Sequence, residues 1–532
     1  MAVDPRHPST AAGAILIVIV SVCVTAFVAW TGAYERYDND TAQAVIGARF
    51  ISAGDGYLTD GLYYQEHYRP QTIPAPQTVF PPGSSMMIAG LTKLSLTPPQ
   101  ALSVIAFVAL GLVPICVFLL ALKAGVRASL AVVVALLWIG VASAWENAYR
   151  LRGDVPFLML TVISTWFLAR PVRRPVAFAL IGGCFAAMAL LVRYAGLFYM
   201  TAAALCIVFD WWRRKTRTEF LELVAFCIPT GITVLLLFVR NYQAVGDVKG
   251  GNSFVANKPT VQSIREFYEM WVSLTGFGHT NLFNWNPVEY VMIAAAVLGV
   301  ILLIIHRRSI RLDRTVIQVL VDGRVATICI VYPVLAIAML VWLEFNSSCG
   351  MRARMFMVFI PYLMIIGVFV PQVAKTQSGG KSFRLVGMLL IVGFLLGQVE
   401  AGKTALVELP SLNTIKAACE SPVDETNLGD FLREKISAEH PLVVNEPQIV
   451  AAYLERPVVG LADWRYTDIV WDSEAVRQHA KTHDVQWLLV FTDESLGSDW
   501  VPFLAELAAG QTASWLKLKS ANKQHRLYRV VD

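Results

Sequence analysis

The sequence predicts a polytopic α-helical membrane protein with a small α/β domain at its C-terminal end. Of its 532 residues, 56% are hydrophobic and 16% are charged, and the mean hydropathy is +0.55. One or two soluble cores do not account for so apolar a chain. About 20 apolar residues cross a bilayer, and about eleven such stretches precede residue 401, after which the composition becomes ordinary.

Charged and turn residues set the limits of each predicted spanning helix. The first apolar run, from Ala11, is too long for a signal-peptide core and has no small-residue cleavage site after it, so we expect it to span. The predicted spans are residues 11–32, 98–121, 128–145, 154–169, 176–192, 194–212, 219–239, 288–305, 325–343, 355–371 and 384–400.

Basic residues between the spans predict the orientation. The short turns on one side hold seventeen lysines and arginines, whereas those on the other side hold five arginines and no lysine. Because basic loops stay in the cytoplasm, we expect loops 33–97 and 240–287 to face outward from the inner (plasma) membrane. The predicted domains are a transmembrane unit over 1–400 and an extracytoplasmic unit over 401–532. Basic residues confined to turns give no support for nucleic-acid binding.

Two further segments carry structural signals. Residues 84–96 are too short to span and too apolar for water, and a proline-rich stretch precedes them, so we predict an interfacial or re-entrant helix. From about residue 405, helix-like and strand-like segments alternate, which predicts a small α/β domain. This domain contains no nucleotide-binding glycine loop and no catalytic-triad pattern. We therefore expect a lid or an acceptor-docking role there.

Arginines at the outer ends of the predicted spans are the first candidate functional residues. Basic residues normally lie in the cytoplasmic loops of a membrane protein, so arginines on the outer side are unexpected. In a bundle they could converge on one outward-facing cavity. A planar guanidinium binds phosphate in a bidentate manner, and the nearest anion is a lipid phosphate. The alternative is that each side chain reaches for lipid headgroups. The candidates are Arg150, Arg152, Arg193, Arg240, Arg352 and Arg354.

Carboxylates on the same side are candidate bases or metal ligands. Asp40 follows the first span and Asp154 begins the fourth, and each also fits a helix-capping role. The two histidines of the outer loops, His67 and His279, do not stand at metal-ligand spacing. A metal, if one binds, would then be a hard divalent ion held by carboxylates such as these two. The sequence leaves that cofactor open. Asp55 and Asp60 lie in a glycine-containing loop and are predicted turn residues.

Five stretches together resemble the GT-C superfamily of integral membrane glycosyltransferases. The resemblance is to the bacterial group similar to protein mannosyltransferases and the lipid A aminoarabinose transferase. Many relatives have Asp-Glu where this chain has Asp40-Thr41. The stretches are DTAQAVIGARFISAGDGY from Asp40, FPPGSSMMIAG, RGDVPFLML, RNYQAVGD at 240–247, and RARMFMVFIPYLMI from Arg352.

The resemblance implies a GT-C-like fold and a glycosyltransferase activity. A hexose or pentose would pass, with inversion, from a polyprenyl-phosphate donor to a hydroxyl of an envelope lipid, polysaccharide or protein. Asp40 and Asp154 would be catalytic or metal-binding, and the six arginines would bind the donor phosphate. The alternative is a transporter or flippase of lipid-linked sugars, but that class places ionisable residues near the bilayer midplane. The middles of these spans are nearly free of charge.

Overall fold

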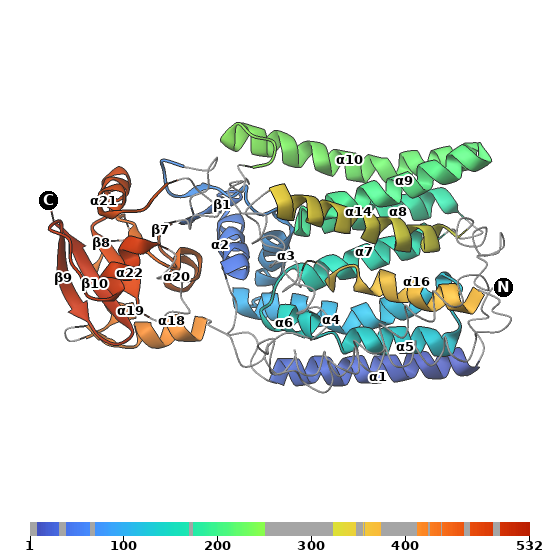
Figure 1. The fold of residues 1–532 in the computed structure, drawn as a ribbon, viewed down its shortest axis with the longest axis horizontal. Coiled ribbons are helices and arrows are strands. Elements are labelled where there is room, and N and C mark those ends of the chain that lie inside the picture. Colours follow the sequence, from blue (N-terminus) through green and yellow to red (C-terminus); the bar gives the residue numbers. More distant parts are fainter. Residues whose placement is uncertain are drawn as a thin grey trace.

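A bundle of helices and a six-stranded sheet make up the protein, with the sheet at one end of the bundle (Figure 1). We call these the sheet end and the far end of the bundle. The computed structural model describes residues 8–30, 39–63, 70–169, 174–250, 323–346, 355, 357–373, 412–423, 426–437, 439–461, 469–492 and 501–531. All statements below concern these residues.

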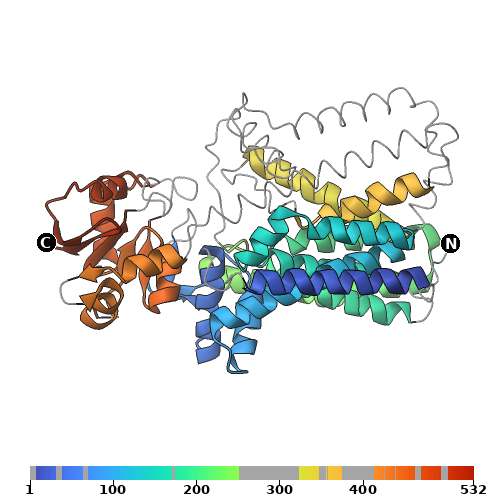
Figure 2. The same cartoon turned by 90° about the horizontal axis from the view of Figure 1, so that it is seen from below.

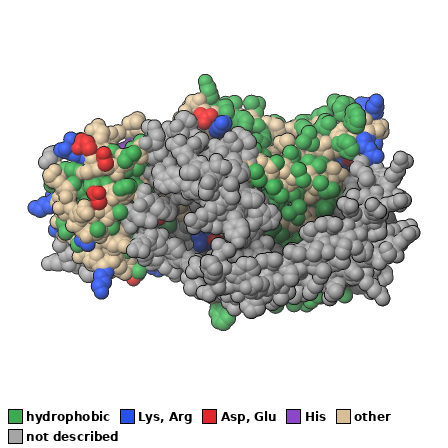
Figure 3. Space-filling model, in the orientation of Figure 1, with side chains coloured by type: hydrophobic (Ala, Val, Ile, Leu, Met, Phe, Trp, Pro, Cys, Tyr) green, Lys and Arg blue, Asp and Glu red, His purple; other side chains and the backbone are tan. Residues whose placement is uncertain are grey.

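Five of the described helices are long and apolar enough to cross a membrane, which confirms the polytopic class. These are α1 (Pro8–Trp30), α4 (Pro98–Lys123), α8 (Pro175–Val192), α10 (Arg217–Val245) and α14 (Arg324–Asn346). The other long helices of the bundle are α5 (Ala128–Ile139), α7 (Asp154–Leu168), α9 (Gly196–Arg214) and α16 (Ile360–Val373). Where Figure 3 shows described side chains on the bundle, most of that surface is hydrophobic, as a lipid-facing surface requires.

Two predicted spans differ from the helices observed. The span predicted over 128–145 is two helices, α5 and α6 (Ala142–Tyr149), with the break at Gly140 and Val141. Helix α10 runs past the predicted limit of 239 and ends at Gly246, whose φ of 73° is the left-handed cap that favours glycine. Arg240 therefore lies within a helix. The spans predicted over 288–305 and 384–400 lie outside the described residues.

Two short helices cross the sheet end of the bundle. Helices α2 (Asn39–Ala53) and α3 (Gly83–Thr92) lie across the direction of the long helices, between the bundle and the sheet (Figures 1 and 2). Helix α3 covers most of the segment 84–96, for which a short helix was predicted. A Cβ on Gly47 would lie 2.4 Å from the Tyr57 ring and 2.7 Å from Ser85 Oγ. Glycine at this position lets α2 pack closely against α3.

The sheet is the main element of the predicted α/β domain, and its strand order is β2-β7-β6-β8-β10-β9. The first four strands are parallel and the last two form an antiparallel hairpin. The strands are β2 (Gly61–Tyr63), β6 (Leu442–Val444), β7 (Val458–Gly460), β8 (Trp487–Phe491), β9 (Leu516–Ala521) and β10 (His525–Val530). The helices around it are α18 (Leu412–Cys419), α20 (Pro447–Leu454), α21 (Ser473–Thr482) and α22 (Pro502–Ala508). Strand β2 comes from the predicted loop 33–97, so the sheet is built from both ends of the chain.

One hydrophobic core joins the sheet domain to the bundle. Ala42 and Ile46 of α2 belong to the same buried cluster as Ile449 and Val450 of α20, and the start of α4 also contributes to it. The predicted boundary at residue 400 lies outside the described residues. The C-terminal residues and the first loop thus share one packed interior.

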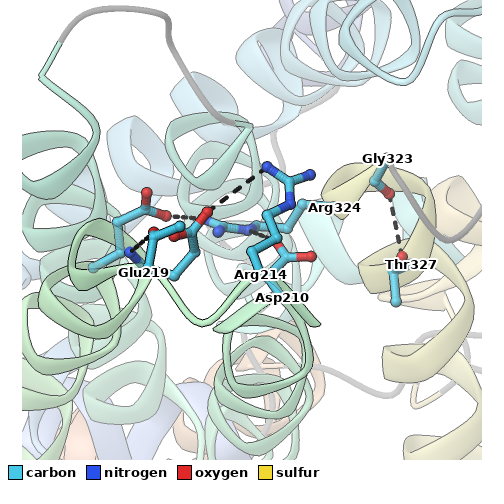
Figure 4. Close-up of polar contacts among 8 residues, drawn as sticks. Asp210, Arg214, Glu219, Gly323, Arg324 and Thr327 are labelled. Carbon is cyan, nitrogen blue, oxygen red and sulfur yellow. Dashed lines mark hydrogen bonds and ion pairs between the residues drawn. The ribbon is translucent and has the colours of Figure 1, made fainter. Parts of the chain in front are cut away.

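A buried group of charges joins three helices at the far end. Arg324 at the start of α14 donates through Nε to Asp210 of α9 (2.6 Å) and through a guanidinium NH2 group to Glu222 of α10 (2.5 Å) (Figure 4). All three side chains are at most 5% exposed. A guanidinium between two buried carboxylates holds α9, α10 and α14 in fixed relation.

Candidate active site

Asp40 is held at the junction of the bundle and the sheet domain. It lies in the first turn of α2 and is half-buried. Helix α2 begins at Asn39, so Asp40 follows the helix start and is not the N-cap that sequence reasoning allowed. The next residue, Thr41, is buried and donates from Oγ1 to the carbonyl of Arg150 (2.8 Å). This contact fixes the start of α2 against the turn that follows α6.

That turn places two of the predicted arginines beside one carboxylate. Glu146 of α6 forms ion pairs with Arg150 (3.2 Å) and with Arg152 (3.6 Å). Leu151 between them has a φ of 55°, which is a left-handed backbone conformation. Arg152 also donates to Asn147 Oδ1 at 3.5 Å. The turn therefore gathers positive charge within reach of the start of α2.

Asp154 pairs with a third predicted arginine. Its carboxylate accepts a hydrogen bond from Arg193 (2.8 Å), which directly follows α8, and Asp154 is 2% exposed. The N-cap of α7 is Gly153 and makes no side-chain cap, so the capping role considered for Asp154 is wrong. A Cβ on Gly153 would lie 3.2 Å from Ser84 Oγ. The start of α3 thus lies directly against this pair.

Arg240 makes a different set of contacts. Its guanidinium donates to the carbonyls of Gln77 (2.5 Å) and Tyr57 (3.2 Å) and lies 4.9 Å from the centre of the Tyr57 ring. Burial raises the pKa of the Tyr57 phenol above its ordinary value, although Arg240 acts in the opposite direction. Its neighbour Asn241 donates to Tyr194 Oη at 3.1 Å. Arg240 therefore ties α10 to the first loop.

Five of the predicted site residues are thus brought to one place. Asp40, Arg150, Arg152, Asp154 and Arg193 lie at the sheet end, within or beside the turn between α6 and α7. Arg352 and Arg354 lie outside the described residues. Glu146, which sequence analysis did not include in the site, completes a set of three arginines and three carboxylates. An incoming phosphate would compete with Glu146 for Arg150 and Arg152.

The described residues do not form a metal centre by themselves. None of their histidine, cysteine, aspartate and glutamate side chains gather in a group of three or more that could hold a metal ion. Asp154, one of the two predicted ligands, is already paired with Arg193. The predicted pair of metal ligands therefore lacks a third partner in the described part of the chain.

Comparisons of sequence find no relative. No protein-family model matches this chain, and no curated protein matches its sequence.

Comparisons of structure find membrane enzymes over nearly the whole chain. ArnT from Cupriavidus metallidurans bound to undecaprenyl phosphate has a TM-score of 0.51 at 13% identity, with 97% of each chain covered. The Archaeoglobus fulgidus oligosaccharyltransferase in complex with Zn and sulfate has a TM-score of 0.52 at 12% identity, covering 98% of this chain and 73% of that one. Arabinofuranosyltransferase AftD from Mycobacteria has a TM-score of 0.51 at 12% identity, covering 100% and 40%.

At these identities the comparisons establish the fold. The fold expected from the five motifs is confirmed at that level, because these solved structures match 97–100% of this chain.

Proposed function

We propose that this protein is a glycosyltransferase that uses a polyprenyl-phosphate-linked sugar. It would transfer a hexose or pentose, with inversion, to a hydroxyl of an envelope lipid, polysaccharide or protein. The observation that carries the proposal is Asp40, a half-buried carboxylate beside the arginine-rich turn at the sheet end. The fold shared with ArnT, a structure of which holds undecaprenyl phosphate, supports a lipid-phosphate donor.

The reaction requires a proton acceptor for the acceptor hydroxyl and positive charge beside the leaving phosphate. The acceptor oxygen forms a bond to the anomeric carbon as the bond from that carbon to the phosphate oxygen breaks, and the phosphate leaves with the electron pair. The acceptor proton passes to a carboxylate within hydrogen-bond reach, a role we assign to Asp40. Guanidinium groups offset the charge of the leaving phosphate, a role we assign to Arg150, Arg152 and Arg193.

The remaining predicted residues fill supporting roles. Asp154 would hold Arg193 in place through their 2.8 Å contact and orient the acceptor. Arg352 and Arg354 keep their predicted role at the donor phosphate. Arg240, whose guanidinium is bonded to loop carbonyls, would hold the first loop. The sequence left a divalent metal ion open, with Asp40 and Asp154 as its ligands, and the steps proposed here pass through no metal.

Product analysis tests the proposal. The purified protein is supplied with a polyprenyl-phosphate sugar and extracts of envelope lipid, polysaccharide and protein. We expect free polyprenyl phosphate to appear together with sugar on one of these acceptors. A flippase would move the donor across a vesicle membrane and leave it chemically unchanged.

Replacing Arg150 or Arg193 with Lys should weaken donor binding about tenfold. The charge remains but the bidentate geometry is lost, and a hydrogen bond between charged groups contributes about 1.5–3 kcal/mol. The measurement is the affinity for polyprenyl phosphate in detergent micelles. Arg174→Lys is the matched control, because Arg174 is exposed in the turn before α8. Unchanged affinity in both site variants would count against this phosphate site.

We also propose that the sheet end faces outward from the inner (plasma) membrane. A cysteine introduced at Glu474, whose side chain is 77% exposed on α21, should then react in intact cells with a membrane-impermeant thiol reagent. A cysteine introduced at Lys215, in the exposed turn between α9 and α10 at the far end, should react only after lysis. The reverse pattern would overturn the orientation and the lipid-linked donor with it.

A further inference from the structure

The sheet domain contacts the first residue of α2, directly beside Asp40. Asn39 Nδ2 donates to Glu446 Oε2 at 2.8 Å, and the two residues are 407 positions apart in the chain. Glu446 is 6% exposed and lies at the start of α20. A hydrogen bond to a carboxylate is shorter and stronger than one between neutral groups. The start of α2 is therefore fixed by a residue of the C-terminal domain.

Further along α2, the strand β2 inserts between the two parts of the protein. Gly61 pairs with Val458 of β7, and Val458 N donates to the carbonyl of Asp60 (2.8 Å). A Cβ on Gly61 would lie 3.0 Å from Ile46 Cδ1 of α2 and 3.1 Å from Ala451 Cβ of α20. Only a residue without a side chain lets the strand pass this close to both helices.

Two polar side chains of α2 then fix this helix against the strand and the residues before it. Gln43, one turn after Asp40 and 4% exposed, donates from Nε2 to the Gly61 carbonyl (2.9 Å) and accepts from Thr59 Oγ1 (3.0 Å). Arg49 forms an ion pair with Asp60. Burial raises the pKa of Asp60 to about 6, against the attraction of Arg49, so the carboxylate is half ionised near that pH and fully ionised only well above it. Helix α2 can neither rotate nor slide without breaking these contacts.

We propose that Glu446 is a positioning residue for Asp40, and that the C-terminal domain is the scaffold that fixes α2. This inference rests on the proposed function, because the role of Asp40 comes from it. A general base must lie within hydrogen-bond reach of the proton it takes. A misplacement of about 1 Å can lower the rate by about 100-fold. The domain would thus act on turnover without touching the substrate.

The test uses the full-length protein and three variants of neighbouring residues, at a pH well above 6. Glu446→Ala removes the bond to Asn39, whereas Glu446→Gln keeps an oxygen that accepts it. Asn445→Ala is the matched control: Asn445 bonds the backbone of Phe491 inside the sheet domain, at 3.0 and 3.3 Å. This variant weakens contacts inside the sheet domain but keeps the bond between Asn39 and Glu446.

We expect Glu446→Ala to lower kcat by about 10- to 100-fold with KM little changed, and Glu446→Gln to restore most of it. Asn445→Ala should leave kcat near that of the unaltered protein. Equal losses in Glu446→Ala and Asn445→Ala, or no loss in Glu446→Ala, would overturn the inference. If Glu446→Ala does not fold, Asn39→Ala removes the same bond from the other side and is judged by the same criteria.

Hydrogen exchange separates this inference from the proposed function. The amides of the first turn of α2 should exchange faster in Glu446→Ala and unchanged in Asn445→Ala. A protein that transfers no sugar but shows this exchange pattern would refute the proposed function and keep the scaffold. A protein that transfers sugar but shows no faster exchange in Glu446→Ala would refute the scaffold alone.

Discussion

Replacing Asp40 with Asn is expected to lower sugar transfer by about 100-fold or more while the protein still folds and binds its donor. The amide has the size and the hydrogen-bonding oxygen of the carboxylate, and losing the charge in the first turn of a helix costs only about 0.3–1 kcal/mol. It cannot take a proton from the acceptor. The measurements are the rate of transfer from a polyprenyl-phosphate sugar, the affinity for the donor, and the thermal unfolding midpoint.

Asp55→Asn is the control for this experiment. Asp55 is exposed in a turn of the same loop, so the change in charge is identical and far fewer contacts are lost. Near-normal turnover in Asp40→Asn would leave Asp40 with a role in helix packing only. An equal loss in both variants would point to the net charge of the loop and not to a base.

Replacing Arg324 with Met should destabilise the bundle by about 3–5 kcal/mol, the cost of removing one partner from a buried ion pair. Asp210 and Glu222 would then be two carboxylates at most 5% exposed that have lost their guanidinium partner. The measurement is the free energy of unfolding in detergent micelles. We expect the triple variant with Asp210→Asn and Glu222→Gln to recover most of the loss, because no buried charge remains.

Arg217→Met is the control, because Arg217 is exposed at the start of α10. A change at an exposed site should stay within about 0.5 kcal/mol. If both variants lose the same stability, the buried pairs contribute nothing beyond ordinary surface charge. Retained stability in Arg324→Met would show that the three helices are held together by packing alone.

Most of the bundle could be predicted from the sequence, because a spanning helix is a local property of about 20 residues. The predicted span 176–192 and helix α8 agree within one residue at each end. Helix α3 could be predicted because its segment is too short for a span and too apolar for a solvated loop. The break between α5 and α6 was not predicted, because Gly140 and Val141 add no charged or polar side chain to the apolar stretch.

Contacts between distant segments could not be read from the sequence. Strand β2 is three residues long in a glycine-containing loop, and its partner β7 lies about 400 residues further on. Asp60 was predicted as a turn residue, and its burial against Arg49 could not be predicted for the same reason. Arg324 was predicted as a basic residue of an inner turn. Nothing local shows that Asp210 and Glu222 would meet it.

The candidate site was predicted in part. Charge at the ends of spans grouped Arg150, Arg152 and Arg193 in one predicted site, and the structure has Arg150 and Arg152 paired with Glu146 and Arg193 paired with Asp154. The same signal grouped Arg240 with them, but α10 continues beyond it and turns its guanidinium toward loop carbonyls. Gln43 and Glu446 carried no signal, because an uncharged amide and a carboxylate of a soluble domain are common residues on any surface.

The position of β2 in the sheet also sets the order in which the protein can be completed during synthesis. The ribosome makes this strand within the first 63 residues, but the strand that pairs with it begins at Val458. Helix α1 precedes β2, and the other four described spanning helices lie between β2 and β7, so all five can insert before the pair forms. The helix that carries Asp40 acquires its final support as one of the last events of folding. A chain that stops after its last span would hold the whole bundle and still be inactive.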